Sequence, residues 1–137
     1  MATVVPQVLQ VELHPYWNQH ELRDWLEPMG VRFEAWYPLG HGDRALPNDP
    51  VLTEIAQRRG KTVAQVILHW DFQNGVVTFP KTLNPEHMAQ NLDIFDFELT
   101  DDEMAAIDGP DKGTPYYRIP EEAPAFIAAT PDFDQQQ

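Results

Sequence analysis

The 137-residue sequence contains no cysteine. Disulfides, thiolate zinc sites and thiol nucleophiles are therefore excluded. The sequence also lacks an apolar run near the roughly 18 to 20 residues that a membrane-spanning helix needs. The sequence has no basic segment followed by an apolar one, so no secretory signal is visible. Since nothing favours an oxidising compartment, we expect a cytoplasmic protein with no membrane partner.

Positive charge is scarce as well. The chain has 9 Lys and Arg against 22 Asp and Glu, for a net charge of −13. Such a chain is repelled by phosphate polymers, so we expect no nucleic-acid partner, although a local basic pocket can still hold one small anion. Hydrophobic residues make up 42% of the sequence, which is enough for a packed core. The length fits one ordinary domain or part of a larger one.

Strands and helices alternate along the first hundred residues. Short apolar segments predict strands at residues 8–13, 31–36 and 76–79. Cap residues predict helices that begin at the following positions: Asn18 with Glu21, Asp49, Thr62 with Gln65, Asn84, and Thr100 with Glu103. This order favours parallel βαβ units and an α/β fold.

Two of these helices carry apolar faces that we expect to point inward. In the first helix they are Leu22, Trp25, Leu26 and Met29. In the helix that follows Asn84-Pro85 they are Met88, Leu92 and Phe95. The segment 76–79 has the composition of a buried strand.

Three parallel strands leave two unpaired edges, which is a poor arrangement for a free-standing sheet. The pattern is more typical of part of a (β/α)8 barrel or of a doubly wound sheet. We expect this α/β portion to span residues 1–110. Residues 111–137, rich in proline, alanine and acidic residues, are predicted to form a loop or tail.

In parallel α/β folds, ligands bind at the carboxyl ends of the strands. Polar and aromatic residues follow all three predicted strands, at 10–16, 36–43 and 81–91. Gln10 could pair with another carboxamide, or simply bond to neighbouring backbone. Trp36 could stack on a planar ring, or belong to the core.

Lys81 and Thr82 precede the helix cap Asn84-Pro85. A cation, a hydroxyl and a helix N-terminus together suit a phosphate group, but a capped helix beside a solvated lysine fits equally well. His87 lies in the first turn of that helix and could donate to a phosphate. Gln90 and Asn91 could meet the edge of a heterocycle or only water.

Two histidine–carboxylate neighbours, His14 with Glu12 and His41 with Asp43, suggest a metal site or a general base. Neither has a known metal-ligand spacing, and no glycine-rich phosphate loop or nucleophile elbow is present. We expect no metal.

At these clusters the sequence resembles the C-terminal part of the aldo-keto reductase family. The similar segments, in family order, are Gln10–Tyr16, Ala35–Gly40, Val76–Thr82, Asn84–Asn91 and Phe95–Thr100. They are similar to the ends of the sixth, seventh and eighth barrel strands and to the closing helices. The resemblance implies a partial (β/α)8 TIM barrel, made of the last three strand–helix units. It also implies an NADPH-dependent oxidoreductase that reduces small aldehydes or ketones.

The resemblance assigns cofactor-binding roles to ten residues: Gln10, Trp36, Tyr37, Leu39, Lys81, Thr82, Leu83, His87, Gln90 and Asn91. Gln10 would bond the nicotinamide carboxamide and Trp36 would stack on its ring. Tyr37 and Leu39 would lie along the pyrophosphate, and the residues from Lys81 onward would hold the adenosine side. His87 stands where the family usually has Arg, so NADH remains an alternative cofactor. Tyr37 stands where a Ser is common.

The family's catalytic Asp, Tyr, Lys and His lie in the first half of its barrel, so we expect no catalytic residue in this chain. As written, the chain would be a truncated and inactive portion of the enzyme. The alternative is a non-catalytic cofactor-binding or interaction module. A partner chain, as an oligomer or as the missing barrel half, would then complete the barrel.

Overall fold

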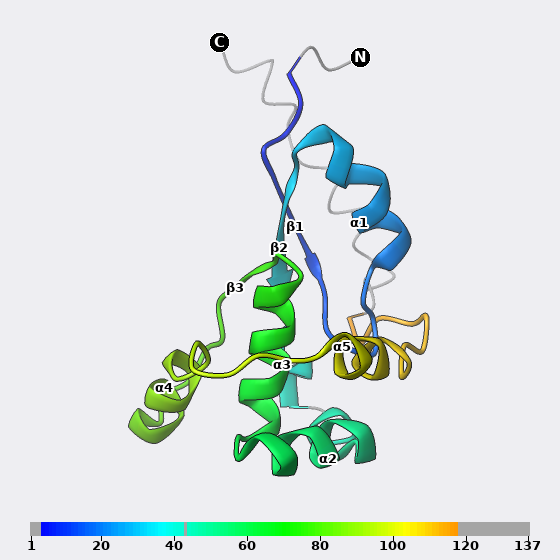
Figure 1. The fold of residues 1–137 in the computed structure, drawn as a ribbon. Coiled ribbons are helices and arrows are strands. Elements are labelled where there is room, and N and C mark those ends of the chain that lie inside the picture. The colour runs from blue at the N-terminus through cyan, green and yellow to red at the C-terminus, as the bar shows by residue number, and fades with distance from the viewer. Residues whose placement is uncertain (1–3, 43, 118–137) are drawn as a thin grey trace.

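The computed structural model describes residues 4–42 and 44–117 (Figure 1). Its strands β1 (Val8–Glu12), β2 (Arg32–Trp36) and β3 (Val77–Thr78) form one parallel sheet in the order β1-β2-β3. The predicted α/β alternation is therefore confirmed. In this register Gln10 lies opposite Glu34, and Glu12 lies opposite Trp36.

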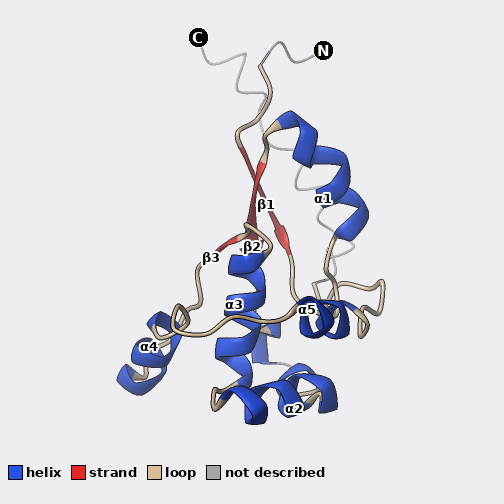
Figure 2. Cartoon of the chain, viewed as in Figure 1, coloured by secondary structure: helices blue, strands red, loops and turns tan. Residues whose placement is uncertain are grey.

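The helices follow the predicted order. They are α1 (His20–Leu26), α2 (Pro50–Arg59), α3 (Val63–Gln73), α4 (Pro85–Leu92) and α5 (Asp101–Asp108), with short 3-10 turns η1 (Glu27–Met29), η2 (Gly40–Gly42) and η3 (Leu46–Asn48). Figure 2 shows α4 beyond β3, apart from α2 and α5. Within the described residues, no helix combines the length and apolar character needed to cross a membrane.

The core lies between the sheet, α2, α3 and α5. Its fully buried members include Leu52, Ile67, Trp70 and Ile107. Four predicted caps form as expected: Asp49 accepts the Val51 and Leu52 amides, Asn84 accepts the Glu86 amide, and capping boxes form at the first turns of α3 and α5. Each cap satisfies amide groups that a helix start leaves unpaired.

The predicted start of α1 is wrong by one residue. Gln19 is the N-cap, in the left-handed region at φ 56°, and its side chain donates to the Glu12 carbonyl at 3.0 Å. Asn18 instead accepts from the His20 amide at 3.0 Å. Because the start moves by one, Glu21 falls one position short of the one from which it could complete a capping box.

The inward apolar faces predicted for two helices are largely wrong. In α1 only Leu26 is buried, and Trp25 is 64% exposed. In and after α4, Met88, Leu92 and Phe95 are 48%, 75% and 65% exposed. Leu26 and the partly buried Leu22 reach the core, and the Phe95 ring meets the Phe72 ring edge-on at 5.1 Å, but most of each stripe is exposed in the described part of the chain.

The third strand also differs from its prediction. Val76 is buried, but Val77 and Phe79 are 44% and 63% exposed. Segment 76–79 pairs with β2 on one side only, through two residues. It is therefore an edge strand rather than a strand buried on both faces. Of the predicted tail, residues 118–137 lie outside the described residues.

Candidate functional site

A pocket of about 290 Å³ lies at the carboxyl ends of the three strands. Half of the predicted cofactor residues line it: Gln10, Trp36, Tyr37, Leu39 and Lys81. They come from the segments that end β1, β2 and β3, so the parallel topology brings together residues up to 71 positions apart (Lys81 minus Gln10). The prediction that the three strand ends share one rim is confirmed in the geometry.

Gln10 is exposed, and its side-chain amide donates to the Glu34 carboxylate. The parallel register places these two residues opposite each other on β1 and β2. The bond to Glu34 uses the carboxamide nitrogen, so the oxygen is still available as an acceptor. Sequence reasoning missed Glu34, and only the strand register could have identified it.

Three aromatic rings stack beside Gln10. The Tyr37 ring lies 4.0 Å from the Trp36 ring, at 24°, and 4.0 Å from the His41 ring, at 5°. Tyr37 has a left-handed backbone, with φ 56°, which is uncommon for a bulky residue and is found at functional sites. His41 was considered with Asp43 as a metal or base pair, but Asp43 lies outside the described residues.

Lys81 supplies the positive charge of the pocket. It is exposed and, as far as the structure describes the chain, forms no ion pair or hydrogen bond. The Thr82 hydroxyl accepts the Asn84 amide at 3.1 Å, and Asn84 accepts the Glu86 amide at 2.9 Å. Thr82 keeps its hydroxyl proton for donation. The capped-helix interpretation holds here, and it leaves a cation and a donor available to an anion.

The other predicted cofactor residues lie outside the pocket at the strand ends. Thr82 and Asn91 line a larger groove, of about 1020 Å³, between α3, β3 and α4. Leu83 is 89% exposed, His87 is exposed and Gln90 is half-buried. These three residues line neither pocket.

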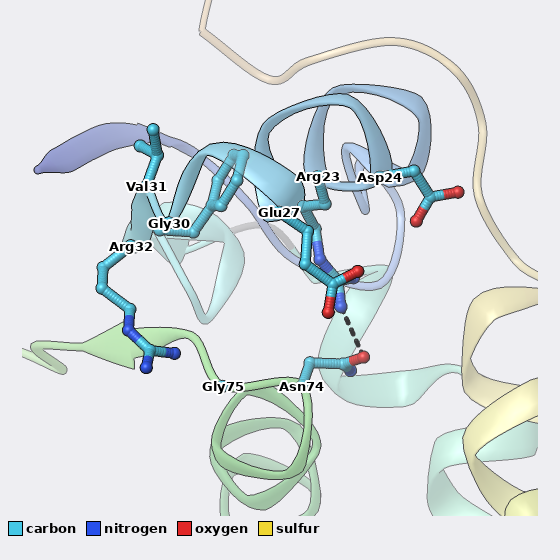
Figure 3. Close-up of a pocket in the computed structure, with 9 residues that line it drawn as sticks. Arg23, Asp24, Glu27, Gly30, Val31, Arg32, Asn74 and Gly75 are labelled. Atoms are coloured by element: carbon cyan, nitrogen blue, oxygen red, sulfur yellow. Dashed lines mark hydrogen bonds between the residues drawn. The ribbon is translucent and has the colours of Figure 1, made fainter. Parts of the chain in front are cut away.

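A second polar pocket, of about 350 Å³, lies near the start of β2 (Figure 3). Arg23 in it donates to the Asn74 side chain, and Asp24 and Glu27 add negative charge. This pocket is at the opposite end of the strands from Gln10 and Lys81. It shares no residue with the predicted cofactor site.

Glu12 and His14 form a buried pair that sequence reasoning treated as a weak metal or base candidate. His14 Nε2 lies 3.0 Å from a Glu12 carboxylate oxygen, and both side chains are buried. The same carboxylate accepts the backbone amides of Tyr116 and Tyr117. Among the described residues, no three His, Asp or Glu side chains gather as a metal cluster.

The buried carboxyl group of Asp71 and the half-buried one of Asp108 lie away from the pocket. Burial raises the pKa of Asp71 well above its usual value, with Arg23 and Thr78 opposing the effect. Burial also raises the pKa of Asp108, against the hydrogen bond that Trp70 donates to it at 3.1 Å. Asp71 lies on α3, Asp108 is bonded by Trp70 of α3, and neither residue lines the pocket.

The pocket residues suit one half of a nicotinamide dinucleotide. A carboxamide, an indole, a cation and a hydroxyl provide the hydrogen bonds, stacking surface and charge that such a molecule needs. The pocket of about 290 Å³ is too small for the whole dinucleotide. Lys81 also lines the larger groove, together with Thr82 and Asn91.

Comparisons with known proteins identify the family. The family model described as the Aldo/keto reductase family matches residues 1–112. Among curated proteins, the chain is 49% identical over 123 residues to morphine 6-dehydrogenase of Pseudomonas putida, covering 82% of this chain and 42% of that protein. It is 49% identical over 111 residues to glyoxal reductase of Bacillus subtilis (strain 168), covering 81% and 40%.

The chain is also similar to part of several solved structures. A Gox0644 variant in complex with NADPH matches with a TM-score of 0.75 and 43% identity, over 80% of this chain and 40% of that one. A Bombyx mori aldo-keto reductase in complex with NADP matches with a TM-score of 0.80 and 31% identity, over 89% and 42%. The chain therefore spans about two fifths of the length of the relatives it matches.

Proposed function

The chain belongs to the aldo/keto reductase family, and from that premise we propose that it forms the cofactor-binding portion of an NADPH-dependent oxidoreductase. Its three parallel strands are part of a (β/α)8 TIM barrel. The whole enzyme would reduce a small aldehyde or ketone to an alcohol. When bound, the nicotinamide supplies the hydride for that reduction.

One observation supports this proposal most directly: five residues with complementary chemistry meet in the pocket at the strand ends. Gln10 would bind the nicotinamide carboxamide, and Trp36 would offer its indole face. Tyr37 and Leu39 would border the pyrophosphate, while Lys81 would bind phosphate. Thr82, Leu83, His87, Gln90 and Asn91 would follow the adenosine half along the α4 side.

Fluorescence titration of the full chain with NADPH tests the proposal. We expect saturable binding and a Kd about tenfold or more weaker in Lys81→Met, because a charge-assisted bond to phosphate is lost. Arg58→Met is the matched control, since Arg58 is an exposed cation on α2 with only a long ion pair to Glu54, at 3.9 Å. Absence of saturable binding, or equal weakening by both variants, would contradict the proposal.

The choice between NADPH and NADH depends on His87 in this proposal. His87 is exposed at the first turn of α4 and lacks the permanent charge and planar fork of arginine. We expect His87→Arg to tighten NADPH binding severalfold and to leave NADH binding unchanged. Equal effects on NADPH and NADH binding would contradict the assignment of His87 to the 2′-phosphate site.

We also propose that the chain alone does not turn over a carbonyl substrate. The support is the resemblance, which assigns the family's catalytic Asp, Tyr, Lys and His to the first half of the barrel, and the need of carbonyl reduction for a positioned proton donor. The purified chain should oxidise NADPH no faster with an aldehyde than a sample without protein. Turnover of about 1 s⁻¹ or more would overturn this part of the proposal.

A second candidate function is that of a module completed by another chain. The free edge of β3 and the groove of about 1020 Å³ favour it, because Phe79, Leu92 and Phe95 expose apolar surface there. A chain that brings a parallel strand to β3 would cover this surface. Sedimentation velocity should then show concentration-dependent association. A cooperatively melting monomer at every concentration would count against this candidate.

A further inference from the structure

Residues 112–117, here called the strap, pack across the segment that follows β1. The Lys112 amide donates to the Tyr16 carbonyl at 3.0 Å, and the Lys112 ammonium lies 3.5 Å from the centre of the Tyr16 ring. The Tyr116 ring lies 4.7 Å from the His14 ring. These contacts join parts of the chain about one hundred residues apart.

The strap is anchored at its end by one buried carboxylate. Glu12 is 7% exposed and accepts the Tyr116 amide on one oxygen and the Tyr117 amide, at 2.9 Å, on the other. His14 Nε2 lies 3.0 Å from the first of these oxygens. Hydrogen bonds to an ionised acceptor are shorter and stronger than neutral ones, and burial of the acceptor keeps water from competing for them.

The same residue stands beside the predicted cofactor site. Glu12 lies opposite Trp36 in the sheet, and the Leu13 amide donates to the Trp36 carbonyl at 3.1 Å. The Tyr117 ring meets the Trp36 ring edge-on, with centroids 4.9 Å apart at 72°. The anchored end of the strap therefore packs directly against the indole.

We propose that Glu12 is a positioning residue that holds Tyr117 against Trp36 and thereby fixes the indole for a nicotinamide ring. The link to the cofactor rests on the proposed function, whereas the anchoring of the strap does not. Both oxygens are needed, because each accepts one backbone amide. A glutamine would offer one oxygen and turn its own N–H₂ group toward the second amide.

Amide hydrogen exchange of the full chain tests the anchor without any cofactor. In Glu12→Gln we expect the Tyr116 and Tyr117 amides to exchange about tenfold faster or more, the factor that corresponds to one lost charge-assisted hydrogen bond. Glu54→Gln is the matched control, because Glu54 is exposed on α2 and should leave both amides unchanged. Unchanged exchange in Glu12→Gln would overturn the anchor.

NADPH titration tests the positioning role. Tyr117→Ala removes the ring that touches Trp36 and leaves Glu12 and the backbone amides in place. We expect it to weaken NADPH binding severalfold, as Glu12→Gln does, and the double variant to be no weaker than either one, since both act through the same contact. Additive losses, or a freed strap with unaltered NADPH binding, would overturn the positioning role.

The tests also cover a Glu12→Gln variant that does not fold and a wild-type chain that does not bind NADPH. If Glu12→Gln does not melt cooperatively, Tyr117→Pro deletes one donated amide hydrogen while Glu12 stays intact, and faster exchange at Tyr116 is again expected. If the wild-type chain binds no NADPH, the positioning role falls together with the proposed function. The exchange data then still decide whether Glu12 anchors the strap.

Discussion

The region formed by α2, α3 and α5 differs sharply from the region formed by β3 and α4. In the first, apolar side chains such as Leu52, Ile67 and Trp70 are fully buried. Arg59 also binds Glu103 across its helices, with Arg59 Nε 3.1 Å from one carboxylate oxygen. In the second, α4 buries no residue, and Leu92 is 75% exposed.

Both regions have sound local sequence signals. Asn84 caps α4 as predicted, just as Thr62 and Thr100 cap α3 and α5. What differs is the presence of a second apolar surface to pack against. Local capping fixes where a helix begins, whereas burial of its apolar stripe depends on a neighbour from elsewhere in the fold.

We expect the largest loss of stability when a buried side chain is removed from the region of α2, α3 and α5. Trp70→Ala should lower the free energy of unfolding by about 3–5 kcal/mol. Trp70 is fully buried, and its indole N–H donates to Asp108. Urea denaturation measures the change. Trp25→Ala, at a residue that is 64% exposed, is the control and should cost about 0.5 kcal/mol or less.

The next effect concerns the ion pair in the same region. The hydrogen bond from Arg59 lowers the pKa of Glu103 in the folded state. The ion pair therefore stabilises the fold fully above the unfolded-state pKa of Glu103, and this stabilisation is lost as pH falls through the folded-state pKa. Glu103→Gln should cost about 1–3 kcal/mol at pH 7 and progressively less in acid. Urea midpoints across this pH range measure it. A cost that does not vary with pH would contradict the ion pair's role.

A smaller effect is expected where the two regions meet, at Asp71 on α3. Burial raises the pKa of this carboxyl, so the folded state holds its proton to higher pH than the unfolded state does. Stability is therefore greatest below the unfolded pKa and declines as pH rises toward the folded pKa. Asp71→Asn should be more stable than wild type by about 1 kcal/mol at pH 8. The difference should shrink as pH falls, in thermal melts of both proteins.

The smallest effect is expected in the uncovered region. Leu92→Ser should change the free energy of unfolding by about 0.5 kcal/mol or less, because Leu92 has little packing to lose. Sedimentation should show less self-association than wild type, if this surface is where another chain docks. A large loss of stability would mean that α4 is packed in solution and would remove the contrast between the two regions.

The alternation of strands and helices was predictable because it rests on short-range signals. Cap residues located the starts of α2, α3, α4 and α5, but the apolar face that included Phe95 overran the end of α4 at Leu92. The start of α1 was not predictable in the same way. It depends on Gln19 reaching the Glu12 carbonyl, a contact with a different element.

Some residues of the candidate site were likewise predictable from local sequence, and others were not. Gln10, Trp36 and Lys81 could be proposed from sequence because each lies in or just after a predicted strand, and parallel strands end at one rim. Glu34 and the aromatic stack of Tyr37 with His41 could not, because the first requires the strand register and the second requires a left-handed backbone at Tyr37.

The order of the elements and the caps of α2, α3, α4 and α5 could be predicted from sequence, since they depend on residues within a few positions of one another. The family resemblance came from five segments spread along the chain. The tertiary structure decided which apolar faces are covered and which long-range partners meet. Glu12 shows the difference most clearly. Its neighbours in sequence suggested a metal or a base, but its two oxygens accept amides more than one hundred residues away. No local pattern encodes such a contact, because it exists only once the chain has folded back on itself.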